Sequence, residues 1–208
     1  MARYTGPVCR LCRRDGMKLF LKGFRCDSTK CAIDRRPNPP GQQLSRRSKL
    51  TDYGIHLREK QKVKHYYGVL ERQFRRYFEK AVHSRGNTGD ALLGFLERRL
   101  DNVVYRMGFG ASRSAARQLV NHGHVTVNGR RCDIASSMVN TGDVIRVKNR
   151  AKSLDLVRGV LAEHGRDVPD FLSVSAGDIP EGIVSRLPVA EDASLPIQTQ
   201  LIVELCSR

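Results

Sequence analysis

The chain has 208 residues, and its 37 Lys and Arg outnumber its 21 Asp and Glu to give a formal net charge of +16. This length allows one sizeable core or two small ones. No apolar run is close to the length of about 20 residues that a helix needs to span a bilayer. The N-terminus is not followed by the hydrophobic segment that a signal peptide contains. We therefore expect a soluble, cytoplasmic chain without a membrane partner, and a monomer outside any larger particle.

The positive charge is concentrated in residues 1–150, which hold 32 Lys and Arg against 12 Asp and Glu, whereas residues 151–208 hold 5 against 9. Such an excess is evidence about partners rather than about the fold. Nucleic acid is the obvious polyanion, and an anionic membrane surface is the competitor. Aromatic residues make up only 6% of the chain, which favours recognition of folded RNA by shape over stacking on single strands.

Four cysteines near the N-terminus form two short-spaced pairs, Cys9 with Cys12 and Cys26 with Cys31. Each pair can present two thiolates to one ion, which suits a tetrahedral site. Neighbouring Lys and Arg favour deprotonated thiols. We therefore predict one structural zinc ion, because four thiolates leave no open coordination position. Two disulfides or four free thiols and an iron–sulfur cluster are the alternatives.

The proline-rich residues 37–41 predict an extended connector. Helical periodicity begins near Thr51, a candidate helix cap, and Gly68 divides this helix from a second one. The buried row expected on the second helix is Tyr67, Leu70, Phe74, Tyr77 (or Phe78) and Ala81. Arginines crowd its remaining positions, and two glutamates would pair with some of them. By itself, this basic helix is equally compatible with a membrane surface or a partner's groove.

Residues 97–148 predict a compact unit of two helices, a hairpin and a further strand, and the apolar stripe of its first helix begins at Leu92. An apolar stripe with steps of three and four residues predicts one helix over 92–107. Ser112 would cap a second helix that Gly123 closes. Asn128-Gly129 then predicts a β-hairpin turn, and a further strand would point Ile145 and Val147 inward.

Arginines of this unit fall at positions that we expect to be exposed. Arg113 and Arg117 step along the outer side of the second helix, and Arg130 and Arg131 follow the hairpin turn. This pattern favours a nucleic-acid-binding surface. The alternative is an arginine-rich face that is only solvated.

The C-terminal part carries weaker signals. Residues 154–164 predict a short helix, a proline-punctuated stretch follows, and residues 201–203 predict a final buried strand or short helix. The carboxylates of residues 163–192 indicate a solvated or protein-facing surface.

Enzymatic signatures are absent. The glycines at 108 and 110 form neither a dinucleotide fingerprint nor a phosphate loop. No serine, cysteine or lysine has an evident local base. His122 and His124, at a helix end, more often cap carbonyls or touch phosphate than act in catalysis. We predict that the chain is not an enzyme.

Several of these segments carry a family resemblance. RRLDNVVYRMGF, followed by SRSAARQLVNHGHVTVNG, is similar to the RNA-binding module of the bacterial small-subunit ribosomal protein four family. The similarity continues through REKQKVKHYYGVLERQFRRYFEKA, TGDALL, the N-terminal MARYTGP and the terminal LIVEL. It is weakest over 150–195. All four cysteine positions match the zinc-bearing type of the family. One departure is Gln42-Gln43-Leu44, where the family commonly has Gln-His-Gly, so contacts of that loop stay open.

The resemblance implies an α+β fold. It comprises a mostly helical first domain with an N-terminal zinc arm, plus an inserted helix-helix-hairpin RNA-binding module with a small antiparallel sheet. The implied domains are the arm with its connector over 1–45, a helical domain over 46–97 completed by 197–208, and an inserted domain over 98–196 with its module core at 98–150.

The resemblance also implies a function, that of a structural constituent of the small ribosomal subunit. The implied protein binds 16S rRNA, nucleates subunit assembly and contributes to translational accuracy by contact with a neighbouring ribosomal protein. Some members also repress their own messenger RNA. The expected RNA contacts are Arg13, Arg14, Arg46, Arg47, Lys49, Lys62, Lys64, Arg72, Arg75, Arg76, Arg113, Arg117, His124, Arg130 and Arg131.

Two rival functions belong to other classes. An RNA-modifying enzyme can carry the same module, but residues 1–96 are too basic and too poor in motifs for a catalytic domain. A zinc-dependent DNA-binding regulator would place the Arg113 helix in a major groove, yet the sequence shows no dimerisation heptad or recognisable finger.

Overall fold

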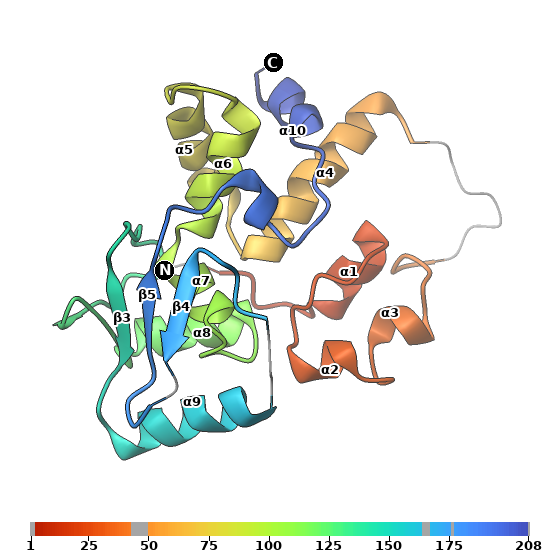
Figure 1. The fold of residues 1–208 in the computed structure, drawn as a ribbon. Helices are drawn as coiled ribbons and strands as arrows, with labels where there is room; N and C mark the ends of the chain where they lie inside the picture. Colours follow the sequence, from red (N-terminus) through yellow and green to blue (C-terminus); the bar gives the residue numbers. More distant parts are fainter. Residues whose placement is uncertain (1–2, 43–49, 164–166, 176, 208) are drawn as a thin grey trace. The chain divides into compact units, whose positions relative to one another are not determined.

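The computed structural model describes residues 3–42, 50–163, 167–175 and 177–207. The fold is α+β, as predicted (Figure 1). The chain divides into two compact units, of which unit 1 comprises residues 1–92 with 193–208 and unit 2 comprises residues 93–192.

Unit 1 is helical. Its elements are α1 (Cys9–Asp15), α2 (Phe24–Asp27), α3 (Ala32–Arg35), α4 (Asp52–Tyr67), α5 (Glu71–Val82), the start of α6 (Thr88–Glu97) and α10 (Thr199–Cys206). The Thr51 hydroxyl accepts a hydrogen bond from the Gly54 N–H at 3.2 Å, which confirms the predicted cap of α4. Gly68 ends α4 with φ +63°, a left-handed conformation that glycine adopts without strain.

The C-terminal residues form a helix, α10, that packs on α4. Of the two predicted forms for residues 201–203, the helix is therefore correct. The buried row of α5 is Phe74, Tyr77, Phe78 and Ala81. The prediction for Leu70 was wrong, because Leu70 lies at the cap position before α5 and is 40% exposed.

Unit 2 joins helices to a five-stranded antiparallel sheet. After the end of α6 come α7 (Leu100–Arg106), α8 (Arg113–Asn121), β1 (Val125–Val127), β2 (Arg130–Arg131), β3 (Val144–Val147), α9 (Ala151–Glu163), β4 (Leu172–Ser175), β5 (Glu181–Val184) and a 3-10 helix, η1 (Ala190–Asp192). The strand order is β2-β1-β3-β5-β4. One core contains residues of α7 and α8 together with inward residues of β1, β3, β4 and β5.

The single helix predicted over 92–107 is wrong, because it is two helices, α6 and α7. Arg99 is extended, with φ −66° and ψ 135°, and pairs with Met138 as an isolated bridge. Backbone hydrogen bonds to residues 135, 137 and 139 replace helical ones at this break. An apolar period continues across the break, so periodicity alone does not detect it.

The sequence did not predict β4 and β5. Both strands are only four residues long; β4 alternates apolar and polar side chains over too short a run to stand out, and β5 does not alternate. Gly182 of β5 lies against the Met107 side chain, where an added Cβ would come within 2.6 Å of Sδ. This close approach explains a glycine in the middle of a strand.

Candidate nucleic-acid interface

Helix α8 begins as the sequence predicts. The Ser112 hydroxyl accepts a hydrogen bond from the Ala115 N–H at 3.2 Å. The expected exposure of its arginines, however, is wrong: Arg113 and Arg117 are only 7% and 6% exposed. The physical reason is a set of carboxylate and amide acceptors on α6 and α7, which the helical pattern does not reveal.

Asp101 is one centre of this buried network. Its carboxylate accepts two hydrogen bonds from Arg99, Nε to Oδ1 at 3.0 Å and Nη2 to Oδ2 at 2.5 Å. Arg117 Nη1 of α8 approaches Oδ2 at 3.4 Å. Arg99 is fully buried and Asp101 is 4% exposed. A fork-shaped pair of this kind fixes both side chains in direction as well as in distance.

Glu97 is the second centre and is also fully buried. Its Oε2 accepts from Asn102 Nδ2 at 2.7 Å and from Arg106 Nε at 3.2 Å. The Asn102 Oδ1 in turn accepts from Arg113 Nε at 2.9 Å. The Arg113 guanidinium also lies 4.3 Å from the centre of the Tyr105 ring. Arg113 is therefore held by an amide and an aromatic face beneath the surface of α8.

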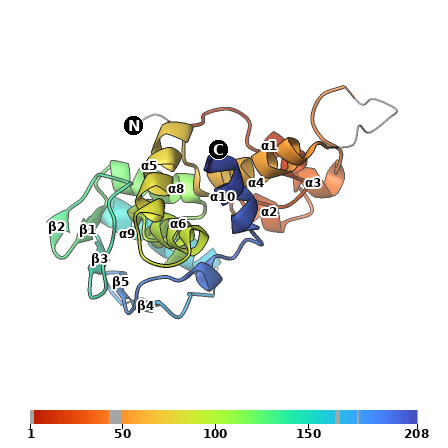
Figure 2. The same cartoon turned by 90° about the horizontal axis from the view of Figure 1, so that it is seen from above.

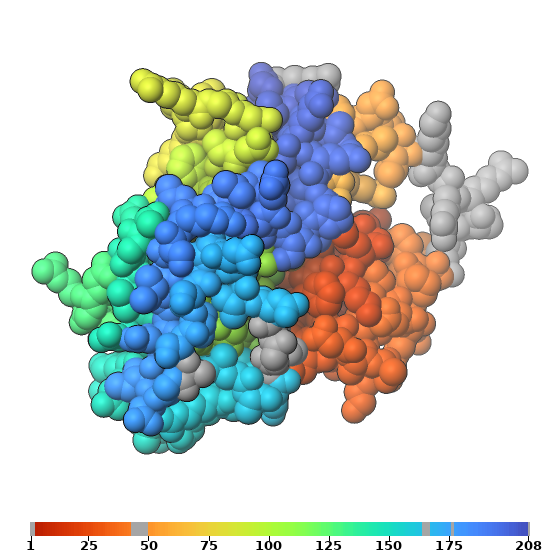
Figure 3. All heavy atoms as spheres, in the orientation of Figure 1, coloured from red at the N-terminus to blue at the C-terminus, as the bar shows by residue number. Residues whose placement is uncertain are grey.

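The hairpin β1–β2 presents two arginines as expected. Asn128 and Gly129 have φ of +50° and +77°, as a two-residue hairpin turn requires. Arg130 and Arg131 are both exposed and form β2, an edge strand of the sheet (Figure 2). In the space-filling view, green atoms of this part of the chain project from the surface (Figure 3). Arg131 Nη2 is 3.6 Å from Asp133, and both side chains are more than half exposed. Such a pair is weak, so Arg131 can turn to a phosphate at little cost.

His124 is half-buried at the start of the sheet, where its Nδ1 lies 2.8 Å from the Ser153 hydroxyl. Burial lowers the pKa of His124, and His122, Arg150 and Lys148 lower it further by charge repulsion.

On α5 the predicted arginines Arg72, Arg75 and Arg76 are exposed. Lys62 and Lys64 of α4 are half-buried and bound to carboxylates, Lys62 to Glu59 and Lys64 to Glu71 at 2.6 Å. The α4 lysines are therefore partly neutralised within the protein, whereas the α5 arginines offer most of their charge to solvent.

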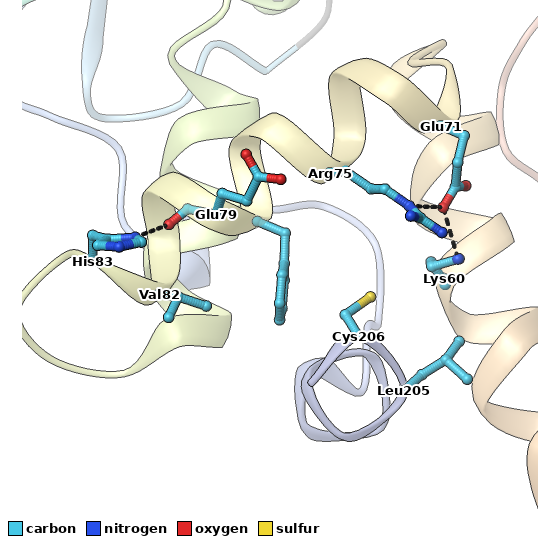
Figure 4. Close-up of a pocket in the computed structure, with 9 residues that line it drawn as sticks. Lys60, Glu71, Arg75, Glu79, Val82, His83, Leu205 and Cys206 are labelled. Carbon is cyan, nitrogen blue, oxygen red and sulfur yellow. Dashed lines mark hydrogen bonds and ion pairs between the residues drawn. The ribbon is translucent and has the colours of Figure 1, made fainter. Parts of the chain in front are cut away.

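A pocket of about 380 Å³ lies among α4, α5 and α10 in unit 1 (Figure 4). Glu71 binds Lys60 at 2.9 Å and Arg75 at 3.3 Å along one wall. Phe78 and Leu205 line it too, with the Cys206 thiol facing the ion pairs. Cations and carboxylates alternate in this lining, so it lacks the positive excess of a phosphate site.

Glu71 makes a testable contribution to acid stability. Burial raises the pKa of the Glu71 carboxyl, but hydrogen bonds from Lys64 and Lys60 outweigh it and lower the pKa to about 2. Its stabilisation is thus present above the unfolded pKa of about 4.3 and is lost as the pH falls toward 2. The carboxylate is 37% exposed, so screening limits its value to about 1 kcal/mol. Urea denaturation should show Glu71→Gln less stable at pH 7 and close to wild type at pH 2; an equal deficit at both would contradict this.

In the arm, two predicted RNA contacts bind the connector. Arg13 Nε donates to the Asn38 carbonyl at 2.8 Å, and Arg14 Nη2 to that of Pro40 at 3.5 Å. Both arginines hold the proline-rich segment against α1. The predicted contacts Arg46, Arg47 and Lys49 lie outside the described residues.

The four arm cysteines are mostly buried, with Cys12, Cys26 and Cys31 at 7–8% exposure. The Lys22 N–H donates to Cys26 Sγ at 3.3 Å. Burial raises the pKa of the Cys12 thiol, a backbone hydrogen bond from Leu19 opposes this, and the other three sulfurs raise it again. Amide N–H groups aimed at sulfur suit thiolate ligands of a metal. Within the described ranges, however, no three His, Cys, Asp or Glu side chains are grouped closely enough to hold a metal ion.

None of the helices in the described part of the chain is long and apolar enough to cross a membrane. Each unit by itself carries predicted RNA contacts that are exposed or half-buried: the hairpin arginines and His124 in unit 2, and the α5 arginines in unit 1.

Comparison with known proteins places the chain in a family. Residues 3–97 match the ribosomal protein S4/S9 N-terminal domain, and residues 98–145 match the S4 domain. The chain is 56% identical over 208 residues to small ribosomal subunit protein uS4 of Thermoanaerobacter sp., with 100% of both chains covered. The chain belongs to the uS4 family. The uS4 proteins of Desulfitobacterium hafniense and Thermodesulfovibrio yellowstonii are 57% and 55% identical to it over 209 residues, again with full coverage of both chains.

Membership in the uS4 family confirms the resemblance at the level of the family and the prediction that this chain is a structural protein and not an enzyme. Sequence reasoning missed the residues that organise its α7–α8 surface, Glu97, Asp101 and Asn102. A signal was available, because two carboxylates and an amide stand beside Arg98 and Arg99 in a stretch that is otherwise apolar.

Proposed function

We propose that this uS4 family member is a structural constituent of the small ribosomal subunit that binds 16S rRNA directly in the cytoplasm and nucleates subunit assembly. The observation that carries the proposal is the exposed arginine surface on α5 and on the β1–β2 hairpin, in a chain matched along its full length by uS4 proteins. Phosphate contacts from these cations would fix the register of the protein on folded RNA.

Further parts of the proposal concern protein and messenger partners. The acidic residues of 163–192 would face a neighbouring small-subunit protein, a contact through which the chain would contribute to translational accuracy. Arg186 donates two hydrogen bonds to Asp192, at 2.7 and 2.8 Å, and so holds this part of the acidic segment in a defined conformation. Repression of its own messenger RNA would use the same RNA-binding surface.

We also propose that Cys9, Cys12, Cys26 and Cys31 bind one structural zinc ion. Support comes from the two short-spaced pairs, from the burial of three of the thiols and from the amide donor at Cys26. Zinc would supply folding free energy to the arm rather than chemistry. Arg13 and Arg14 would then hold the connector against an arm of fixed shape.

The RNA function is tested by a filter-binding titration over a salt series, with 16S rRNA competed against unrelated folded RNA and duplex DNA. We expect selective binding to the 16S rRNA with a steep dependence on salt. Replacing both Arg130 and Arg131 with glutamine should weaken binding and reduce the salt slope by about one for each phosphate that is no longer neutralised.

The matched control is Arg158→Gln, because Arg158 is an exposed arginine of α9 that donates to the Asp178 carbonyl. It should leave affinity and salt slope close to those of the wild type. Equal binding of the wild type to all three nucleic acids would overturn the proposal, and an unchanged slope in the double variant would remove the hairpin from the interface.

A further inference from the structure

Two histidines and two further cations meet where α8 leads into the sheet. The rings of His122 and His124 have their centroids 6.0 Å apart and are inclined by 45°. The Lys148 N–H donates to the His124 carbonyl at 2.8 Å, which sets the end of β3 beside the start of β1. Arg150 follows and precedes the first residue of α9. His122 and Arg150 are exposed, and His124 and Lys148 are half-buried.

The charges that act on His124 are all positive. After burial, the groups that lower its pKa are His122, Arg150 and Lys148, and none of these is a carboxylate. The Ser153 hydroxyl of α9 lies at Nδ1, which leaves Nε2 for a ligand. Asp133, which follows β2, lies 3.6 Å from Arg131 and is paired with that arginine.

The cationic surface continues from this cluster to the hairpin. Gly123, between the two histidines, has φ +70°, and an added Cβ would come within 2.5 Å of Arg131 Nε. The Arg131 side chain therefore lies against the Gly123 backbone, beside both histidines. The α8–β1 turn thus contacts Arg131 of β2 on one side and is hydrogen-bonded to the end of β3 on the other.

We propose that His122, His124, Lys148 and Arg150 form a proton-linked site for a phosphodiester group of RNA. This inference rests on the proposed RNA-binding function and names a binding site and its proton linkage. In the free protein, burial and the charge of His122, Arg150 and Lys148 disfavour protonation of the His124 ring. A phosphodiester carries one negative charge, so its binding favours the imidazolium forms, and each proton taken up comes from solution.

The sign of the linkage follows from this repulsion. RNA raises the pKa of a histidine that it contacts, so binding tightens as the pH falls from about 8 to about 5.5 around the unperturbed value of about 6.5. For each histidine whose pKa rises by about one unit, affinity should increase about tenfold over that range.

The experiment measures the Kd for 16S rRNA at fixed ionic strength from pH 5.5 to 8.0, with calorimetry in two buffers of different ionisation enthalpy to count protons. The wild type should bind more tightly at low pH with net proton uptake. Replacing both His122 and His124 with glutamine should remove the uptake and flatten the pH profile. His122→Arg should instead keep tight binding at pH 8, because its charge does not titrate.

His83→Gln is the control, because His83 is an exposed histidine of unit 1 whose Nδ1 contacts the Glu79 carbonyl. It should retain the wild-type pH profile. Selective RNA binding with no proton uptake, or uptake that persists in the double glutamine variant, would overturn the site while leaving the RNA function in place. Absence of selective rRNA binding at every pH would overturn both. Circular dichroism at each pH verifies that the variants stay folded.

Discussion

Replacing Asp101 with asparagine should lower the free energy of unfolding of unit 2 by about 3–5 kcal/mol, the usual cost of removing one partner from a buried ion pair. The asparagine would keep the shape of the side chain but lose the charge opposite Arg99, whose side chain has no exposure. Arg117 would lose the same carboxylate, at 3.4 Å. Two guanidinium groups would then share a low-dielectric site without their counter-charge.

The measurement is urea denaturation followed by hydrogen exchange in peptides of α7 and α8, which reports on unit 2 separately from unit 1. The control is Asp133→Asn, because Asp133 pairs with an arginine at the surface and should change stability by less than about 0.5 kcal/mol. In a double-mutant cycle, Arg99→Met should recover part of the loss caused by Asp101→Asn. Equal, small effects of both asparagine variants would show that the buried network is not needed for stability.

The buried network also changes what α8 can do for RNA. Among the residues that form it, the guanidinium groups of Arg99, Arg106 and Arg117 bind the two carboxylates of Glu97 and Asp101, and the guanidinium group of Arg113 binds the Asn102 amide oxygen. An excess of positive charge therefore lies just beneath the surface of α8. It attracts an approaching phosphate through its electrostatic field, although the arginines themselves are mostly buried. Direct contact of Arg113 or Arg117 with RNA stays a prediction.

Local signals in the sequence were sufficient for several element boundaries. Thr51 and Ser112 each accept the predicted capping hydrogen bond, and Asn128-Gly129 makes the predicted turn. Each of these features depends on a few consecutive residues, so the sequence carries it directly. The short spacing of the cysteine pairs is also a local signal, and the zinc site inferred from it stays a prediction.

Features that depend on distant residues could not be predicted in this way. The break between α6 and α7 exists because Arg99 pairs with Met138, and β5 exists because it pairs with β3 and β4. The burial of Arg113 depends on Asn102, eleven positions earlier on another helix. A helical pattern assigns an arginine to the outer face unless the acceptor that draws it inward is known.

Removal of the proposed zinc ion should unfold the arm and leave the rest of the protein folded. The described part of the arm has few buried apolar side chains of its own, among them the fully buried Leu19, so with the proposed zinc ion it would depend on metal binding for its fold. Binding of structural zinc to small cysteine-rich peptides has a free energy of about 10–16 kcal/mol near neutral pH. Chelation, or Cys12→Ser, should therefore unfold residues 1–45 and expose them to protease while α4, α5 and α10 stay protected.

Elemental analysis of the protein purified under reducing conditions should find one zinc per chain in the wild type and in Cys206→Ser. Cys206 is the matched control, since it is a partly buried thiol of α10 remote in sequence from the arm. If the protein contains iron and absorbs visible light, the cysteines hold an iron–sulfur cluster instead of zinc. A metal-free protein with an intact arm would refute the zinc proposal. Because Arg13 and Arg14 tie α1 to residues 38–40, loss of zinc should also release the connector and so weaken rRNA binding by more than the loss of the two arginines alone.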